Sequence, residues 1–398
     1  MANAKWIDNL VVRASYGLQG NIDKNTSPYL LGNYRIENIL PGGSEDMIDV
    51  SGAPNKKLRW EKTHSVNAGF DFAVLNQAIN LSVDYYYRKG VDLIGTQMLP
   101  LETGFEMLTV NWASMQNQGV EVALSTRNIH TKNFMWTTNF NFAYNNNKIL
   151  KEALREDALE PGREGYPVGA LFALKTAGLD EEGYPMFEGK DGKAVSAMEF
   201  FKLQEWGFGA TDLTARERRE LYTYVGTADC PYTGGFNNTF TYKAFELGVN
   251  FSFDFGGKVR SQPTYSIVDF DKGRNTNRDI LNRWTPENTE TIFPVLLSQN
   301  ERLDEYMWYS NQNEIYRNLD IWIRDLNYVR LQNIRLGYTL PTNFSRKLGM
   351  TSATIAIEGR NLLVFGSSYK NYLDPETMSN AYATPAPKSV TLSLNLNF

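Results

Sequence analysis

The chain is poor in the side chains that most enzymes and metal sites use. Cys230 is the only cysteine among 398 residues, which excludes an intrachain disulfide and makes a thiolate metal site improbable. His64 and His130 are the only histidines, and no serine and aspartate stand beside either in a recognisable catalytic arrangement. We therefore predict no catalytic residues, no cofactor, no metal site and no enzymatic activity.

Long apolar runs and an excess of basic residues are also missing. No apolar run approaches the 18 or so residues of a membrane-spanning helix, and the mean hydropathy is -0.41, so a helical membrane protein is excluded. The net charge of -5 gives no basic footprint, and we predict no nucleic-acid partner. The first residues, M-A-N-A-K-W, lack the basic and apolar regions of a signal peptide.

The last ten residues, S-V-T-L-S-L-N-L-N-F, alternate strictly between polar and apolar side chains. One face of an extended strand there would carry Val390, Leu392, Leu394, Leu396 and Phe398. In a soluble protein the apolar face meets a core, whereas in a transmembrane barrel it meets lipid and the polar face meets a wet lumen. Ten residues tilted by about 45° also cross a bilayer.

Other segments repeat this alternation and predict about ten strands, most of them longer than soluble strands usually are. They lie near residues 10–18, 66–72, 79–85, 120–124, 134–144, 245–255, 328–340 and 355–357. The alternation changes phase once between Leu331 and Ile334, which predicts a β-bulge. The strand that begins at Ile355 is expected to be interrupted at Gly359 to Asn361. The second face of these strands carries Asn, Ser, Asp, Glu and Gly, which cannot fill a dry core but suit a water-filled lumen. We therefore predict an all-β, antiparallel transmembrane β-barrel.

The predicted connections differ in length. Consecutive strands are joined by only a few residues between residues 72 and 79, 127 and 133, and 243 and 245. In contrast, residues 150–235 and 256–325 form long connections, which we expect to be extracellular loops. Within them, capping boxes at Ser196 and Thr214 predict helices over 197–205 and 215–222, and a third helix is predicted over 277–284.

Two loop features admit a functional and a structural interpretation. Residues 269–279 resemble a calcium loop, but the glycine is at the fifth position and the final glutamate is absent, so a solvated loop is the default. Aromatic residues in the loops are candidates for ligand contact, although packing between loops explains them as well. They are Trp206, Phe208, Tyr306, Trp308, Tyr309 and Trp322. The Tyr85-Tyr86-Tyr87 run and Trp136 are interpreted as residues of the aromatic girdle of a barrel.

A series of short motifs resembles one family in order along the whole chain. They include Arg13-Ala-Ser-Tyr-Gly, Leu58-Arg-Trp-Glu-Lys, Asn67-Ala-Gly-Phe-Asp-Phe, Ser82-Val-Asp-Tyr-Tyr-Tyr, Asn117-Gln-Gly-Val-Glu, Arg283-Trp-Thr-Pro-Glu-Asn, Tyr328-Val-Arg-Leu-Gln-Asn, Leu336-Gly-Tyr-Thr-Leu-Pro, Gly359-Arg-Asn-Leu-Leu, Asp374-Pro-Glu and the terminal Leu394-Asn-Leu-Asn-Phe. Together they resemble the SusC/RagA-type TonB-dependent transporters of the Bacteroidetes outer membrane.

The resemblance implies a plugged barrel of about 22 strands in the outer membrane of a Gram-negative bacterium. Such a protein imports oligosaccharides or peptides with energy from TonB-ExbB-ExbD, under a SusD-like surface lipoprotein that closes over the loop aromatics as a lid. No plug, TonB box or N-terminal domain is recognised, so residues 1–398 are interpreted as the C-terminal part of the barrel. By the same resemblance, the strand ending at Phe398 would close the barrel and signal its insertion to the barrel assembly machinery.

Two alternatives stay open at this point. The first is a non-transporting structural or adhesive outer-membrane barrel, and the second is a soluble glycan-binding β-protein. The sequence does not separate glycan from peptide as the substrate, because both require polar, aromatic-rich walls.

Overall fold

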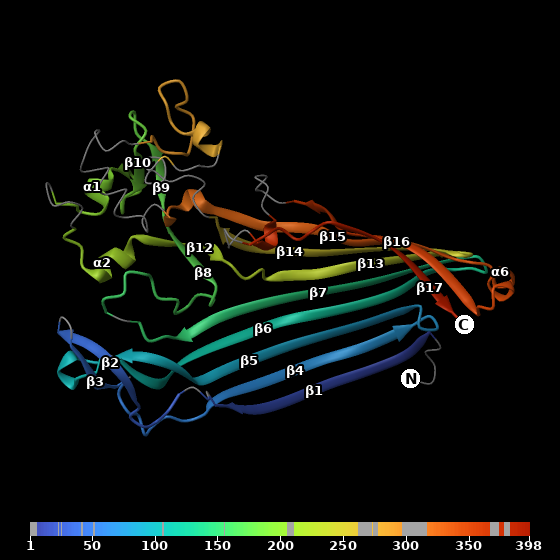
Figure 1. The fold of residues 1–398 in the computed structure, drawn as a ribbon, viewed down its shortest axis with the longest axis horizontal. Helices are drawn as coiled ribbons and strands as arrows, with labels where there is room; N and C mark the ends of the chain where they lie inside the picture. The colour runs from blue at the N-terminus through green and yellow to red at the C-terminus, as the bar shows by residue number, and fades with distance from the viewer. Residues whose placement is uncertain are drawn as a thin grey trace. The chain divides into compact units, whose positions relative to one another are not determined.

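The computed structural model describes residues 6–22, 24, 26–40, 43–50, 52–105, 107–154, 156–204, 211–261, 273, 278–296, 317–366, 374–377 and 383–398. Its long strands follow one another in the order β1-β4-β5-β6-β7-β13-β14-β15-β16-β17 (Figure 1). Contacts divide the chain into a first unit, Met1–Arg127, Asn139–Glu156 and Gly162–Val168, and a second unit that comprises the remainder. The predicted set of about ten long strands is confirmed.

The ten sheet strands are mostly longer than the strands of soluble sheets. Their bounds are β1 Ile7–Asn21, β4 Glu61–Val74, β5 Ile79–Met98, β6 Met107–His130, β7 Phe134–Lys151, β13 Tyr232–Tyr242, β14 Phe245–Arg260, β15 Ile323–Thr339, β16 Ser352–Phe365 and β17 Ser389–Asn397. The sequence pattern underestimated β5 and β6, which have 20 and 24 residues. Beyond the alternating part, backbone pairing from Leu93–Ala113 to Met98–Met107 continues the ladder without a strict side-chain pattern.

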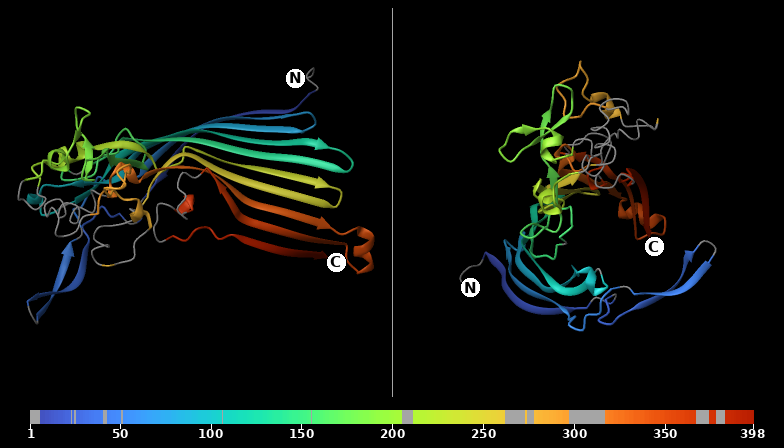
Figure 2. Two further views of the ribbon diagram at one scale, coloured as in Figure 1. Left: turned by 90° about the horizontal axis from the view of Figure 1, so that it is seen from above. Right: turned by 90° about the vertical axis from the view of Figure 1, so that its left-hand side faces the viewer.

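Between β1 and β4, the first unit forms a hairpin that the sequence pattern did not predict. Strands β2 (Gly32–Leu40) and β3 (Gly43–Val50) pair antiparallel and extend away from the long strands (Figure 2). A short 3-10 turn, η1 (Leu101–Thr103), joins β5 to β6. The hairpin carries apolar and charged residues on both strands, so periodicity alone did not reveal it.

The alternating parts of the long strands have one apolar and one polar face, and large apolar side chains on the apolar face are exposed and not packed into a core. Leu392 on β17 is 75% exposed and Phe70 on β4 is 36% exposed, while Phe251 on β14 is partly exposed. In the first unit, Tyr85 lies on the apolar face, but Tyr86 lies on the polar face opposite Gly119. The girdle interpretation is therefore wrong for Tyr86, because neighbouring residues of a strand point to opposite sides.

Tyr86 has a packing role that explains the glycine of the Asn117-Gln-Gly motif. A Cβ at Gly119 would lie 2.6 Å from the Tyr86 hydroxyl oxygen and 2.1 Å from the Tyr144 carbonyl oxygen. The Tyr86 hydroxyl donates to Asn145 Oδ1 at 2.8 Å, one strand further along. Only glycine leaves room for the ring at this position.

In the second unit, the predicted irregularity of β15 is confirmed as a bulge. Asn250 of β14 pairs with Asn333 and the next residue, Phe251, pairs with Leu331, which leaves Gln332 as the extra residue. The expected interruption of β16 at Gly359–Asn361 is wrong, because the strand continues to Phe365. Asn361 adopts φ 53° there, and the local register shift absorbs the irregularity without ending the strand.

One polar cluster interrupts the apolar face of the second unit. Asn238 of β13 is buried and its Oδ1 accepts from Trp136 Nε1 at 2.9 Å and from the Thr138 hydroxyl at 2.8 Å. Asn128 Nδ2 donates to that hydroxyl at 2.7 Å. The hydrogen bonds satisfy polar groups that would otherwise be costly on an apolar surface.

The turns divide into short and long as predicted. The 75–78, 131–133 and 243–244 connections are short, and Leu75, Asn76, Gln77 and Lys243 adopt positive φ. The β7–β13 and β14–β15 connections are long, and so are β1–β4 and β16–β17, which the sequence did not single out. The short α6 (Thr342–Lys347) lies in the β15–β16 turn, and η4 (Pro375–Thr377) lies in the β16–β17 connection.

The long connections of the second unit contain several short elements. They are β8 Ala170–Leu174, β9 Thr176–Leu179, β10 Pro185–Glu188, β11 Ala194–Val195, α1 Ala197–Phe200, α2 Ala215–Glu220, β12 Tyr222–Thr227, η2 Arg278–Asn282 and η3 Asp320–Trp322. The first two predicted helices exist as α1 and α2, the third is the 3-10 helix η2, and all three are shorter than expected. Ser196 and Thr214 accept from the backbone N–H of Glu199 and Glu217, and Thr214 forms a full capping box.

These elements share a hydrophobic core of their own. Leu174, Phe187, Phe201, Leu319 and Trp322 are buried together, and Phe187 stacks on Phe200 at 4.8 Å between ring centroids. In Figure 1 the group of β8–β12, α1 and α2 lies at one end of strands β13–β15, and α6 lies at the other. No helix among the described residues has both the length and the apolar character needed to cross a membrane.

Candidate functional site

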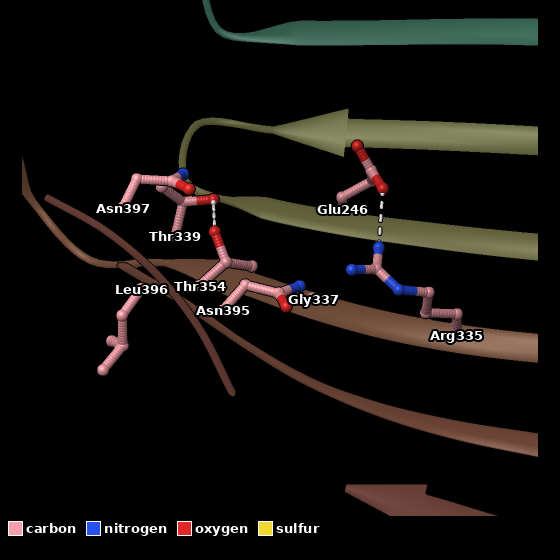
Figure 3. A pocket seen from close by; sticks show the side chains of 8 residues that line it. All are labelled: Glu246, Arg335, Gly337, Thr339, Thr354, Asn395, Leu396 and Asn397. Atoms are coloured by element: carbon pink, nitrogen blue, oxygen red, sulfur yellow. Dashed lines mark hydrogen bonds and ion pairs between the residues drawn. The ribbon is translucent and has the colours of Figure 1, made fainter. Parts of the chain in front are cut away.

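The polar face of β14–β17 in the second unit has a hollow near the short turns. It has a volume of about 490 Å³ and is lined by Glu246, Arg335, Gly337, Thr339, Thr354, Asn395, Leu396 and Asn397 (Figure 3). Arg335 Nη1 donates to Glu246 Oε1 at 2.9 Å, and the Thr339 and Thr354 hydroxyl oxygens are 3.2 Å apart. The lining therefore offers carbonyl, hydroxyl and charged groups, which suit a ligand rich in hydrogen-bonding groups.

A second, buried charge cluster lies on the same polar face, toward the long connections. The Arg330 side chain is 2% exposed, and its Nη2 donates to Asp374 while its Nε donates to Glu376 Oε1 at 2.8 Å. Asp374 Oδ1 also accepts from the Glu376 backbone N–H at 3.1 Å, and its Oδ2 accepts from that of Ala386 at 3.2 Å. The cluster therefore fixes part of the β16–β17 connection against the wall strands.

Tyr328 extends the cluster across to β14. Its hydroxyl donates to Asp254 Oδ2 at 2.5 Å and lies 3.3 Å from Glu376 Oε1. Because Asp254 and Tyr328 are register partners, the pairing of β14 with β15 sets this geometry. Glu376 is the most accessible member, with 42% of its side chain exposed.

The first unit has a polar cluster built from three of the sequence motifs. Arg13 Nη2 donates to Asp71 Oδ1 at 3.1 Å and to Asp84 at 3.0 Å, and the Ser82 hydroxyl donates to Asp71 at 2.7 Å. The register places Gly69 opposite both Arg13 and Asp84, so the guanidinium reaches across a strand that lacks a side chain there. These residues are half exposed, which makes the cluster part of a wet surface and not of a core.

The loop elements of the second unit surround a larger hollow of about 750 Å³ with mixed charge. Lys175 Nζ lies 2.6 Å from Glu188 Oε2, and this hydrogen bond raises the pKa of Lys175. The Thr214 backbone N–H donates to Glu217 at 2.9 Å and lowers the pKa of Glu217. Phe200 and Leu221 supply apolar lining, so the hollow combines charges of both signs with apolar surface.

The sequence-predicted aromatic residues fall into two groups. Trp206, Phe208, Tyr306, Trp308 and Tyr309 lie outside the described residues. Trp322 is 1% exposed in the core formed with Leu174 and Leu319, so it packs between loops and offers no open face to a ligand.

Sequence reasoning missed the roles of several residues inside motifs that it had recognised. Tyr328, Arg330, Asp374 and Glu376 belong to two quoted motifs, but their meeting depends on a connection whose path is not encoded in strand periodicity. The available signal was Arg330, a charged residue at a polar-face position between two apolar neighbours. Most of residues 269–279, the calcium-like loop, lie outside the described residues, and the described ones show no metal-ligand cluster.

Residues 2–171 match the family described as TonB dependent receptor-like, beta-barrel. The chain is 28% identical to the TonB-dependent receptor P3 of Formosa agariphila, over 97% of this chain and 39% of that protein. It is 26% identical to the TonB-dependent receptor SusC of Bacteroides thetaiotaomicron, over 86% of this chain and 32% of that protein. The chain thus spans at most about two fifths of the length of these relatives.

Solved structures share the fold. A structure of the RagAB peptide importer in its open-open state aligns with a TM-score of 0.75 and 22% identity, over all of this chain and 41% of that chain. A structure of the RagAB peptide transporter aligns with a TM-score of 0.74 and 23% identity, over 99% of this chain. The fold prediction is confirmed: the protein is mostly β, and its large antiparallel sheet matches part of a TonB-dependent receptor barrel.

The alternation of faces, the polar clusters and these similarities agree on location and on class. TonB-dependent receptors are transporters and not enzymes, and they lie in the outer membrane. Residues 2–171 match the barrel of outer-membrane TonB-dependent receptors, and the chain as a whole is related to the SusC/RagA-type transporters.

Proposed function

We propose that the chain forms part of the wall of an outer-membrane importer of oligosaccharides or peptides. The observation that carries this proposal is similarity along 86% to 100% of the chain to TonB-dependent receptors that include SusC. The polar faces support it, because a translocated glycan or peptide exchanges hydrogen bonds with its surroundings at each step. Energy would come from TonB-ExbB-ExbD acting on the rest of the receptor.

The short turns are proposed to face the periplasm and the long connections the cell exterior, as in other outer-membrane barrels. The loop elements with their own core would then form an outer rim. A SusD-like surface lipoprotein is the proposed partner at this rim, and the similarity in fold to the RagAB peptide importer supports this choice. The mixed charges of the 750 Å³ hollow and its apolar lining suit contact with a partner or substrate.

The terminal strand is proposed to close the barrel and to carry its insertion signal. Val390, Leu392, Leu394 and Phe398 are exposed on the apolar face, and β17 pairs with β16 from Ser352–Asn397 to Arg360–Ser389. The barrel assembly machinery would bind the apolar face before insertion, and outer-membrane lipid would cover it afterwards.

Gene deletion in the source bacterium tests the import function. The deletion strain should grow poorly on one class of purified oligosaccharide or peptide as sole nutrient, and grow normally on the corresponding monomers. The intact gene should restore growth, and a SusD-like lipoprotein should copurify with the receptor. Normal growth on every substrate, together with loss of adhesion or envelope integrity, would instead support a structural or adhesive barrel.

A further inference from the structure

Three turns at the same end of the strands of the second unit carry basic side chains and no acidic ones. Lys132 lies in the β6–β7 turn, Lys243 in the β13–β14 turn, and Arg346 and Lys347 in α6. All four are exposed, and within the described residues none of them forms an ion pair. The carboxylate nearest to Lys243 in sequence, Glu246, is held by Arg335 on the polar face. In contrast, the 75–78 turn of the first unit carries no charged residue.

Backbone hydrogen bonds hold these three turns side by side. The Lys243 N–H donates to the Asn133 carbonyl at 2.9 Å, and the Thr339 N–H donates to the Ala244 carbonyl at 2.9 Å. Because β15 leads from Thr339 directly into the turn that contains α6, the three turns lie at the same end of the strands (Figure 1). We call these four side chains the basic edge.

Aromatic side chains on the apolar face lie just above the basic edge. Trp136 stacks on Phe240 at 5.6 Å between ring centroids, and Phe245 contacts Tyr338 at 4.6 Å. Lys243 Nζ lies 5.3 Å from the centroid of the exposed Tyr242 ring. Trp and Tyr concentrate where the hydrocarbon region meets the headgroups, so these rings place the basic edge at headgroup level.

The short helix α6 adds apolar anchors at the same level. Phe344 and Leu348, one helical turn apart, are both exposed beside Arg346 and Lys347. Apolar side chains next to basic ones are the pattern of a segment that lies in a membrane interface. Long Lys and Arg stems can reach headgroup phosphates while their methylene groups cover apolar surface.

We propose that the basic edge binds anionic phospholipid headgroups of the leaflet that meets the short turns. The four cations supply uncompensated positive charge, and the adjoining aromatic band continues into the lipid-facing surface. A lipid whose headgroup has a net negative charge, such as phosphatidylglycerol, is attracted to these cations, whereas a lipid with a zwitterionic headgroup is attracted more weakly. The proposal rests on the orientation given under the proposed function, but it does not depend on the transported substrate.

Lipid titration of the protein purified from outer membranes tests the proposal. The protein in mild detergent is titrated with phosphatidylglycerol or phosphatidylcholine, and bound lipids are counted by native mass spectrometry. We expect a preference for phosphatidylglycerol that weakens as ionic strength rises. The variant Lys132→Gln/Lys243→Gln/Arg346→Gln/Lys347→Gln should bind phosphatidylglycerol about tenfold more weakly, with phosphatidylcholine binding unchanged.

The matched control is Lys24→Gln/Arg35→Gln/Lys56→Gln/Lys57→Gln, which removes the same charges from the β1–β4 connection. It should keep wild-type lipid binding, and heat-modifiable mobility should show that both variants are folded. If the first variant does not assemble, Lys132→Gln/Lys243→Gln should show a loss of about threefold. Unchanged phosphatidylglycerol affinity, or an equal loss in the control, would overturn the proposal. Failed import with an intact lipid preference would contradict only the proposed function.

Discussion

Arg330 of β15 donates a hydrogen bond to Asp374, 44 positions later in the chain. Both side chains are buried, and the Asp374 carboxylate also accepts two backbone N–H groups of its own connection. The pair therefore links a wall strand to the segment that precedes the terminal strand. A buried charge pair of this kind depends strongly on both partners, because either one alone would be left unpaired.

Arg330→Ala should destabilise the second unit by about 3 kcal/mol, since it leaves the Asp374 carboxylate buried without its cation. Chemical unfolding of the detergent-solubilised protein measures this loss. Limited proteolysis should also show faster cleavage near residues 374–377. The double variant Arg330→Met/Asp374→Leu should lose less stability than Arg330→Ala, because it buries no charge. Equal stability of Arg330→Ala and wild type would contradict the role assigned to the pair.

Acid should release the same connection. Burial raises the pKa of Asp374, but the hydrogen bonds from Arg330 and from the backbone outweigh it, so the net pKa lies below the usual range. A carboxyl group whose pKa is lower in the folded state stabilises that state above its unfolded pKa of about 3.9. This contribution is lost as the pH falls through the lower folded value.

Hydrogen exchange of the peptide that covers residues 374–377 measures this release. After correction for intrinsic exchange, protection should be constant from neutral pH to about pH 4 and should fall below it. Asp374→Asn should show reduced protection at neutral pH and a weaker additional loss in acid. An acid response as large as that of wild type would assign the effect to another group.

The contact between Arg330 and Asp374 shows how much of the structure sequence patterns can predict. Alternation predicted the strands, the bulge after Leu331 and the short turns, because a strand with one lipid face and one wet face must repeat with a period of two. The meeting of Arg330 with Asp374 was not predictable, because it depends on the path of a connection that has no period. Tyr86 was misassigned for a different reason: the alternation that places Tyr85 on the apolar face places Tyr86 on the polar face, and the girdle interpretation treated the whole run as one group.

Asn238 should be needed as an acceptor on the apolar face. Asn238→Ala leaves the Trp136 Nε1–H and the Thr138 hydroxyl without their acceptor and should cost about 1 to 3 kcal/mol. The triple variant Trp136→Phe/Thr138→Val/Asn238→Leu removes donors and acceptor together and should recover most of this loss. Reversible unfolding in detergent measures both. A triple variant that is less stable than Asn238→Ala would show that these hydrogen bonds do not contribute to stability.

The terminal aromatic residue should matter for assembly more than for stability. Phe398 is 84% exposed, so Phe398→Ala removes no buried contact, but it should lower the amount of assembled barrel at normal synthesis. Heat-modifiable mobility of outer-membrane fractions measures the assembled fraction. Phe365→Ala, an exposed phenylalanine at the end of neighbouring β16, is the matched control and should assemble normally. Equal assembly of the two variants would remove the special role of Phe398.

Trp322 shows a second limit of prediction from sequence, because its burial depends on how the loop elements pack. The sequence left both ligand contact and packing between loops open for Trp322, and its burial against Leu174 and Leu319 makes it a core residue of the loop elements. Trp322→Ala should therefore lower the thermal stability of the second unit, by about 3 kcal/mol or more. Thermal unfolding followed by circular dichroism measures the change, and unchanged stability with altered substrate affinity would contradict the core role.

The most direct test of the two-faced wall is spin labelling along β17 in a Cys230→Ser background. Single cysteines replace Val390, Leu392 and Leu394 on one face and Thr391, Ser393 and Asn395 on the other, and the labelled protein is returned to lipid bilayers. Electron paramagnetic resonance should show the first set exposed to dissolved oxygen and the second set exposed to a water-soluble nickel complex. Identical accessibility of the two sets, or protection of the first set from both reagents, would contradict a wall with lipid on one side and water on the other.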